Sequence, residues 1–381
     1  MKILIIVNSL QQGGAERASI RLAESFLADK HEIVIATWNS NRDFYDLDSN
    51  IKRINIGNFF NHSGFHLPVV GQRFSRIGQA LNLRHYRKEI IKVKPDVVIC
   101  FEALVGSITA VSLLGTKTPL VISERVNPNP VVYRPHRIAQ VLRPLVYRRA
   151  AICSVQTHGF AKWVQANWKI KPMVTPNHIP NEWILNRVNT ENEVTKVTSI
   201  GRVDPQKGFE TLLNAWSRLG DLTEGRTLEI FGRQDNLQYL EFLKEKALKN
   251  VVFHDAQKEI KAIFDTSSVF VSSSRFEGFP NVVLEALARG VPTIASYSSD
   301  IINTLDTMNA LLGYDPEDEE KLVCHLRTII EDSSTRSCLS NAAHEAISGF
   351  TWETVGRSWY LAIEKAKEQK LKRVRWIKHG R

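Results

Sequence analysis

The hydrophobic residues of this chain fall into short continuous runs that alternate with longer stretches where an apolar residue returns every three or four positions. A short run rich in Val, Ile and Phe is typical of a strand buried on both faces, and the longer period is typical of an amphipathic helix. In the C-terminal half the alternation is regular and predicts strands near residues 195–200, 226–231, 251–255, 267–272 and 291–296. Strands separated by helices form parallel, doubly wound sheets, so the pattern predicts an α/β fold.

The N-terminal half alternates more loosely. Residues 2–8 contain the continuous apolar run Ile3 to Val7, which predicts a buried strand, and an amphipathic helix follows it. Gly13 and Gly14 lie between the two, where the backbone can approach a ligand. The stretch from Val97 to Gly115 approaches membrane-spanning length, but Glu102 and several small polar residues interrupt it. We therefore expect a strand followed by a buried helix there.

Length and composition agree with two domains. The chain has 381 residues, 43% of them hydrophobic, which suffices for two α/β cores. An asparagine-rich, weakly periodic stretch between residues 176 and 192 interrupts the pattern. We predict an N-terminal domain over 1–180, a C-terminal domain over 181–350, and a final helix from about 352 to 372 within a basic tail segment, 351–381.

The most informative motif is a strand, glycine turn and helix in which Glu277 and Glu285 bracket the turn. Pro280 suits the first turn of this helix, and Gly290 ends it. Backbone N–H groups at a helix N-terminus favour a phosphate, here those of Gly278, Phe279 and Asn281. Carboxylates beside a phosphate are suited to accepting hydrogen bonds from hydroxyls, so the motif predicts a nucleotide-sugar site. The helix dipole alone also favours acidic residues there, and would suffice to explain Glu285 by itself.

A second motif follows the predicted strand at 195–200. Arg202 and Lys207 flank a loop at its carboxyl end, ahead of an amphipathic helix. Two cations at such an edge suit a diphosphate, because Arg supplies a bidentate fork and Lys a mobile charge. A solvated loop with ordinary surface cations is the alternative.

Two weaker motifs lie in the N-terminal half. The turn at Gly13 and Gly14 continues into Glu16 and Arg17. Its spacing is not that of the dinucleotide fingerprint, so a merely tight connection explains it as well as a binding site does. A strand over residues 119–123 ends in further polar residues, for which a strand-end cap is an equal explanation. These residues are Glu124, Arg125 and Asn127.

Together these motifs resemble the retaining glycosyltransferases of family four, whose signature is a Glu-x7-Glu pair. The resemblance implies the GT-B fold, in which two Rossmann-like domains face a cleft and a C-terminal helix crosses back to the N-terminal domain. It also implies that Glu277 holds the transferred sugar, Glu285 the ribose, and Arg202 and Lys207 the donor diphosphate. Gly13 and Gly14 would lie near the donor phosphate, with Glu16 and Arg17 near the acceptor.

The resemblance further implies retention at the anomeric carbon, with no metal or other cofactor. Relatives with a similar Gly-Gly-Ala-Glu-Arg opening extend undecaprenyl-diphosphate oligosaccharides, so we expect a lipid-linked glycan acceptor in bacterial surface-glycan assembly. UDP is favoured over GDP on the resemblance alone. Many relatives have a histidine where this chain has Arg125, and a guanidinium cannot act as a base at neutral pH. Arg125 would instead contact phosphate, and Glu124 and Asn127 acceptor or sugar hydroxyls.

The distribution of basic residues indicates a further partner. Fifty Lys and Arg oppose forty Asp and Glu, and the excess lies in the basic segments 52–94, 133–149 and the tail after residue 364. These segments suit either a solvated face or an anionic membrane surface, and we favour the membrane. The opening run lacks a signal-peptide cleavage site, so we expect a cytoplasmic protein at the inner face of the membrane.

Two other classes of protein remain as alternatives. A sugar-nucleotide epimerase shares the GT-B architecture but needs no acceptor. A nucleic-acid-binding protein would use the positive charge, but no helix-turn-helix, aromatic sheet motif or zinc site accompanies it. The chain has four cysteines, Cys100, Cys153, Cys324 and Cys338. Their spacing is not that of a metal site, so we expect them to be reduced and structural.

Overall fold

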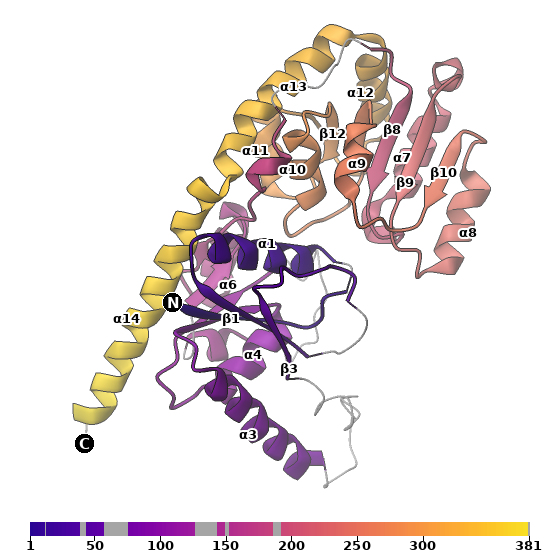
Figure 1. The fold of residues 1–381 in the computed structure, drawn as a ribbon. Coiled ribbons are helices and arrows are strands. Elements are labelled where there is room, and N and C mark those ends of the chain that lie inside the picture. Colours follow the sequence, from indigo (N-terminus) through magenta and orange to yellow (C-terminus); the bar gives the residue numbers. More distant parts are fainter. Residues whose placement is uncertain are drawn as a thin grey trace. The chain divides into compact units, whose positions relative to one another are not determined.

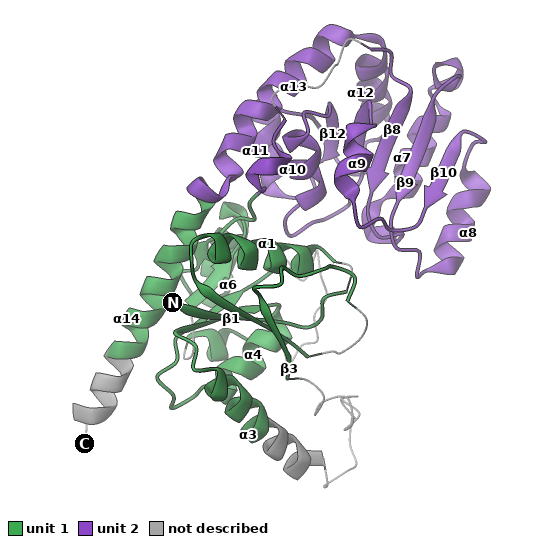
Figure 2. Cartoon of the chain, in the orientation of Figure 1, with its two compact units in different colours: residues 1–178, 355–381 green, residues 179–354 purple. Residues whose placement is uncertain are grey.

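The computed structural model describes residues 1–11, 13–38, 43–56, 75–125, 143–148, 152–185 and 192–379. The chain divides into two compact units (Figures 1 and 2). Unit 1 comprises Met1–His178 and Val355–Arg381, and unit 2 comprises Ile179–Thr354. Each unit has its own parallel sheet and is described by itself.

The described strands of unit 1 form a parallel sheet of seven, in the order β3-β2-β1-β4-β5-β6-β7. They are β1 (Lys2–Val7), β2 (Glu32–Thr37), β3 (Lys52–Asn55), β4 (Val97–Phe101), β5 (Leu120–Ser123), β6 (Ile152–Val155) and β7 (Met173–Val174). The order reverses between β1 and β4, where Ile3 lies opposite Val97. The polar segments that follow these two strands therefore meet at the carboxyl edge of the sheet.

Helices flank this sheet and bury its apolar faces. They are α1 (Gly14–Ala28), α3 (Ser75–Val93), α4 (Ala103–Ser112), α6 (His158–Trp168) and the greater part of α14 (Trp352–His379). The C-terminal helix packs on unit 1 through aromatic contacts: Trp359 stacks on Phe101 with ring centroids 6.4 Å apart, and Tyr360 meets Phe26 edge-on at 5.6 Å. The predicted helical return of the C-terminus to the N-terminal domain is confirmed.

Unit 2 contains a second parallel sheet, with its six strands in the order β10-β9-β8-β11-β12-β13 among the described residues. These are β8 (Lys196–Ile200), β9 (Thr227–Phe231), β10 (Val251–His254), β11 (Val269–Ser272), β12 (Thr293–Ser296) and β13 (Leu312–Tyr314). The order reverses between β8 and β11, where Val197 lies opposite Val269.

Helices alternate with the strands of unit 2. The α-helices are α7 (Phe209–Ser217), α8 (Leu237–Lys246), α9 (Ile260–Asp265), α10 (Asn281–Ala288), α11 (Asp300–Thr307), α12 (Glu319–Glu331) and α13 (Ser333–Ile347). Short 3-10 turns occur at η1 (Asn181–Trp183), η2 (Pro205–Lys207), η3 (Gly220–Thr223) and η4 (Ser348–Phe350).

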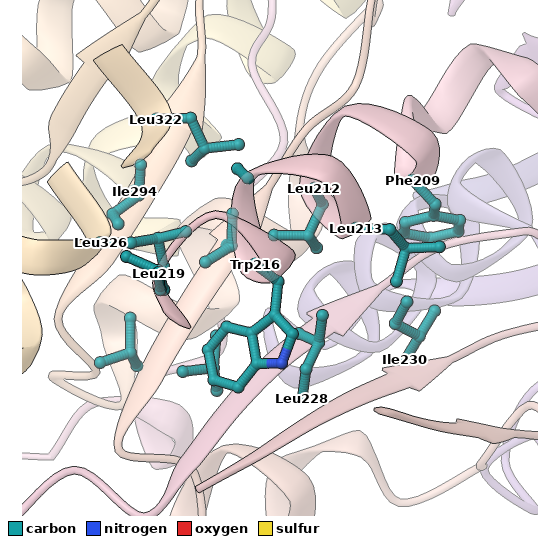
Figure 3. Packing of buried hydrophobic residues seen from close by; sticks show 14 of the residues in the cluster. Phe209, Leu212, Leu213, Trp216, Leu219, Leu228, Ile230, Ile294, Leu322 and Leu326 are labelled. Carbon is teal, nitrogen blue, oxygen red and sulfur yellow. The ribbon is translucent and has the colours of Figure 1, made fainter. Parts of the chain in front are cut away.

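One core of unit 2 forms where α7 lies over the sheet (Figure 3). Trp216 is fully buried, and Leu212 and Leu228 beside it are also inaccessible to solvent. Burial of such side chains contributes about 1.5–3 kcal/mol each relative to exposure. This packing fixes α7, whose N-terminal turn follows the loop that carries Arg202 and Lys207.

The strands predicted in the C-terminal half are confirmed, with bounds that differ by at most a few residues. The helix after β4 is a partial correction: we expected it to be buried, but Leu104 on α4 is 59% exposed and Leu114 just beyond it is 50% exposed. No helix in the described part of the chain is both long enough and apolar enough to cross a membrane. The predicted domain bounds and roles, for acceptor over 1–180 and donor over 181–350, stay predictions.

Candidate active site

The two strongest sequence motifs follow the two central strands of unit 2. Arg202 and Lys207 come after β8, and Glu277 comes after β11. β8 and β11 are neighbours at the point where the strand order reverses. In open α/β sheets this point at the carboxyl edge is where ligands bind. The fold therefore brings together two loops that are far apart in the sequence: Lys207 and Glu277 are separated by 70 positions.

The loop after β8 is shaped by a capped turn. The Asp204 side chain accepts a hydrogen bond from the Gln206 N–H at 3.0 Å and starts η2. Gly208 ends this turn at φ 61°, and a Cβ there would lie 2.2 Å from the carbonyl oxygen of Ser273. Only glycine fits both the left-handed backbone and the close approach of the second loop. The turn thereby presents Lys207 toward the loop after β11.

Lys207 and Glu277 form an ion pair at the centre of the site. Lys207 Nζ donates to Glu277 Oε1 at 2.5 Å, and Ser274 Oγ donates to the same oxygen at 2.8 Å. The side chains are only 18% and 13% exposed. Both bonds go to Oε1, so the second carboxylate oxygen of Glu277 is available as an acceptor.

Hydrogen bonds to main-chain carbonyls join the two loops. Arg275 N–H donates to the Gln206 carbonyl at 2.8 Å, and Gln206 Nε2 donates to the Phe276 carbonyl at 2.9 Å. Ser273 Oγ donates to the Lys207 carbonyl at 2.9 Å. The sequence analysis missed Gln206, Ser274 and Arg275. Their proximity in sequence to Lys207 and Glu277, on loops at one sheet edge, was the available signal.

Arg202 is the more solvent-accessible cation of the pair predicted to bind diphosphate. Its side chain is 47% exposed and forms an ion pair with Asp204, with Nε 3.8 Å from Oδ2. Arg202 and Lys207 thus belong to one loop but differ in setting: Lys207 is held against Glu277, and Arg202 extends into solvent.

The helix after Glu277 differs in detail from the prediction. α10 begins at Asn281, so Pro280 is the N-cap residue rather than part of the first turn. Asn281 N–H donates to the Phe279 carbonyl at 2.9 Å, so the expectation that this N–H is free is wrong, and the role of Asn281 in donor binding stays a prediction. Gly290 follows α10 at φ 68°, as expected for a residue that ends a helix.

Other residues of this motif lie deeper. Phe279 is 7% exposed and belongs to the core between α10 and the sheet. Glu285, on α10, is fully buried. Gly278 lies in the loop between Glu277 and Phe279.

In unit 1, Gly13 and Gly14 lie at the start of α1, as predicted. A Cβ on Gly13 would lie 2.0 Å from Glu16 Oε2, so the Glu16 carboxylate lies back over the N-terminus of its own helix. That position favours a negative charge through the helix dipole. Arg17 Nη2 donates to Tyr45 Oη at 3.4 Å, and Tyr45 Oη donates to the Gly13 carbonyl at the same distance.

The residues predicted after β5 are buried in unit 1. Glu124 is 1% exposed, accepts a hydrogen bond from Tyr147 Oη, and has its second oxygen 3.7 Å from Arg143. Burial raises the pKa of Glu124, and Arg143 and Tyr147 oppose that rise. Arg125 is 7% exposed, donates to Asn177 Oδ1, and lies 4.2 Å from the Phe101 ring centre. The predicted Asn127 lies outside the described residues.

Glu102 is a residue that the sequence analysis passed over as an interruption of an apolar stretch. It directly follows β4 and has φ 72°, a conformation that costs about 1–3 kcal/mol outside glycine and often marks functional sites. Burial, and next the charges of Glu16 and Glu124, raise the pKa of Glu102 to about 7. Its place immediately after a buried central strand was the signal that could have identified it.

Metal ligands do not cluster in the described part of the chain: no group of three or more His, Cys, Asp or Glu side chains there is placed to hold an ion. The four cysteines are free thiols, with Cys100 and Cys153 buried and Cys324 and Cys338 exposed.

Comparison with known proteins identifies the class of protein that has this architecture. Residues 182–346 match the family described as glycosyl transferases group 1. The chain is a glycosyltransferase whose unit 2 is similar to this family, and its two parallel-sheet units have the GT-B fold. The class of enzyme and the fold predicted from the motifs are therefore confirmed.

Individual relatives cover almost the whole chain. An alpha-1,4-N-acetyl-D-galactosaminyltransferase of Campylobacter jejuni is 28% identical over 374 residues, which are 96% of this chain and 99% of that one. The sucrose-phosphate synthase of Thermosynechococcus elongatus superposes with a TM-score of 0.78 at 16% identity, over 96% and 99% of the two chains. The Anabaena protein HepE, solved in complex with UDP, has a TM-score of 0.74 at 14% identity, over 96% and 100%.

Proposed function

We propose that this protein transfers a hexose or N-acetylhexosamine from a UDP-sugar to an undecaprenyl-diphosphate-linked glycan, with retention, in bacterial surface polysaccharide, O-antigen, capsule or glycoprotein glycan assembly. The ion pair between Lys207 and Glu277 at the strand-order reversal carries the proposal, because it joins a cation suited to diphosphate with a carboxylate suited to hydroxyls. The Campylobacter jejuni relative is named for an undecaprenol-diphosphate glycan acceptor, and HepE was solved with UDP.

The donor diphosphate lies over the loop after β8 in this proposal. A lysine ammonium has three N–H donors, so Lys207 can keep its bond to Glu277 and still donate to a phosphate oxygen. Arg202, half exposed on the same loop, closes on the diphosphate from the solvent side. As the sugar–phosphate bond breaks, both cations stabilise the charge on the leaving diphosphate, an effect of about 3 kcal/mol for a lost donor.

The transferred sugar lies against Glu277. Its second carboxylate oxygen accepts hydrogen bonds from sugar hydroxyls, and Lys207 and Ser274 fix the orientation of the group. Glu285 is assigned to the ribose by the family resemblance, and its burial requires α10 or its surroundings to shift when the nucleotide binds.

The proposed transfer needs no nucleophilic side chain. The bond between the anomeric carbon and the diphosphate oxygen breaks, and a new bond to the acceptor hydroxyl oxygen forms on the same face. The acceptor proton passes to the departing diphosphate, which leaves as UDP. Lys207 and Arg202 lower the basicity of that oxygen only partly, so it can still take the proton.

Unit 1 is assigned to the acceptor and to the membrane. The basic segment 52–94 includes the described helix α3, and exposed leucines lie on α4, at Leu104, and just after it, at Leu114. Basic and apolar side chains together suit the headgroup region of an anionic bilayer. The basic segment 133–149 lies largely outside the described residues. The protein is thus proposed to act at the inner face of the cell membrane, where it can bind a lipid-linked glycan.

The test is release of free nucleoside diphosphate from a panel of UDP- and GDP-sugars, with and without an undecaprenyl-diphosphate glycan fraction. Wild type is compared with Glu277→Gln and with Glu320→Gln, which removes an exposed carboxylate of the same unit. Acceptor-dependent UDP release that is lost only in Glu277→Gln supports the proposal. Conversion of the donor to an isomer without acceptor would instead identify an epimerase.

Membrane contact has a separate test, flotation with liposomes. The protein is expected to float with vesicles containing phosphatidylglycerol but not with purely zwitterionic ones, and to lose this binding at high salt. Equal behaviour with both vesicles would contradict the membrane assignment and leave the chemistry untouched. Mixed DNA and RNA serve as competitors, since their binding would point to the nucleic-acid alternative.

A further inference from the structure

The guanidinium of Arg275 contacts three separate segments of unit 2. Its Nη2 lies 2.6 Å from Glu210 on α7, its Nε donates to Glu317 at 3.1 Å, and its Nη1 donates to the Pro205 carbonyl. Its own N–H donates to the Gln206 carbonyl. Arg275 is therefore bonded to the turn that carries Lys207 while lying two residues before Glu277.

The anchor residue Glu210 is itself fixed. It accepts a hydrogen bond from Tyr239 Oη of α8 on the oxygen that does not face Arg275. Glu210 is 21% exposed and Arg275 29% exposed, whereas the outer partner Glu317 is 75% exposed. The inner contacts to Glu210 and Pro205 are thus the ones that hold position, because an exposed pair contributes little.

We infer that Arg275 is a positioning residue for the transfer reaction: it fixes the loop after β11 against the turn after β8, and so sets the distance between the diphosphate-binding cation and the sugar-binding carboxylate. The inference rests on the proposed function of Lys207 and Glu277. Arg275 itself is turned to protein partners on three sides, so it acts through those two residues and not on the donor.

Arginine is needed for this role because its planar fork donates in three directions at once. Lysine keeps the charge, but its three donors share one nitrogen, so it cannot span the positions that the separate Nη1, Nη2 and Nε atoms of Arg275 reach at Pro205, Glu210 and Glu317. If Arg275 served only as a positive charge for the diphosphate, Arg275→Lys would be nearly as active as wild type. A positioning role predicts that Arg275→Lys is impaired almost as much as Arg275→Gln.

A control ion pair lies in the same unit. Arg218 is at the C-terminal end of α7, opposite to the end that follows the turn after β8, and pairs at 2.5 Å with Glu320 of α12. Arg218→Gln removes an ion pair of the same kind without touching the turn after β8 or the loop after β11.

The experiment compares Arg275→Gln, Arg275→Lys and Arg218→Gln with wild type by steady-state kinetics and by amide hydrogen exchange. Misplacement by about 1 Å costs on the order of 100-fold, so we expect kcat to fall 10- to 100-fold in both Arg275 variants. The donor KM should change less than about threefold, since both cations remain. Exchange should rise in residues 204–208 and 273–278, and Arg218→Gln should match wild type in both measurements.

Several results would overturn the inference. Unchanged kcat and exchange would make Arg275 an ordinary surface residue, and full activity in Arg275→Lys would make it a simple charge. A rise in donor KM that accounts for the whole loss would make it a direct ligand. If wild type released no diphosphate from any donor, the proposed function would fail by itself, and the exchange in the two loops would still decide whether Arg275 joins them.

Discussion

The Lys207 ammonium lies 2.5 Å from the Glu277 carboxylate, although the two residues are separated by 70 positions and belong to loops after different strands. The pair exists because β8 and β11 are adjacent at the strand-order reversal, where both carboxyl ends meet. Before a donor binds, each group neutralises the other. The pair thus holds a carboxylate suited to sugar hydroxyls and a cation suited to phosphate in one preorganised unit.

Glu277→Gln is the first test of this pair. It keeps the shape of the side chain but removes its charge and one acceptor oxygen. We expect kcat to fall about 100-fold or more, in the range found for loss of one preorganised polar group. The unfolding free energy should fall by only about 1 kcal/mol, because Ser274 and Lys207 can still donate to the amide oxygen. Equal activity in this variant and wild type, measured by UDP release, would remove Glu277 from the mechanism.

Gly208→Ala is expected to destabilise unit 2 and to separate the two loops. The added Cβ meets the Ser273 carbonyl, in addition to the cost of φ 61°. Gly220→Ala is the control, because its φ is 59° and a Cβ there meets nothing within 4 Å. Left-handed backbone costs about 1 kcal/mol in both variants, so the clash should appear as a further loss of at least about 1 kcal/mol in Gly208→Ala. Urea unfolding measures both, and equal losses would show that the close approach has no energetic weight.

Glu102 gives a pH dependence to stability. Its pKa is raised from 4.5 to about 7 in the folded protein, so between these values the folded state holds a proton that the unfolded state has lost. The unfolding free energy therefore falls as pH rises through this window and levels off above it. Glu102→Gln removes the titration, so we expect it to be more stable than wild type at pH 8 and about equal at pH 4.5. A stability difference that does not change with pH would contradict the raised pKa.

The buried pair of Glu124 and Arg143 is expected to be structural. Arg143→Met removes the cation beside Glu124, which is 1% exposed, and leaves its hydrogen bond from Tyr147. Loss of one member of a buried pair costs about 3–5 kcal/mol, less here if the carboxyl takes up a proton. Adding Glu124→Gln to Arg143→Met should restore much of the stability, and an unrestored double variant would show that the charge is not the cause. Thermal unfolding followed by circular dichroism compares the stability of wild type, Arg143→Met and the double variant.

The sequence predicted the two sheets because their strands are buried on both faces and so appear as continuous apolar runs. Residues 269–272 and 293–296 are examples, each fully buried in the structure. β13 was not predicted because three residues around Gly313 carry too little pattern to separate a strand from a loop. The exposed outer face of α4 was misjudged because a uniformly apolar helix gives no periodicity from which to read its solvent side.

The candidate site was predictable where chemistry and spacing coincide, as at Lys207 and Glu277. It was not predictable where a contact depends on tertiary structure alone. The three-way binding of Arg275 requires the approach of Pro205, Glu210 and Glu317, which are distant in sequence from it and give no local signal. Arg125 illustrates the reverse case: its motif suggested a ligand contact, and the fold buries it against Phe101 and Asn177.

The most direct test of the central claim is calorimetric titration of UDP into wild type, Lys207→Met and Glu277→Gln. Loss of the cation should weaken UDP binding at least tenfold, since a charged hydrogen bond to phosphate contributes about 1.5–3 kcal/mol. Loss of the Glu277 charge should leave UDP affinity equal to wild type or raise it, although transfer is abolished. An unchanged affinity in Lys207→Met would contradict the account, because the diphosphate would then bind somewhere other than the loop after β8.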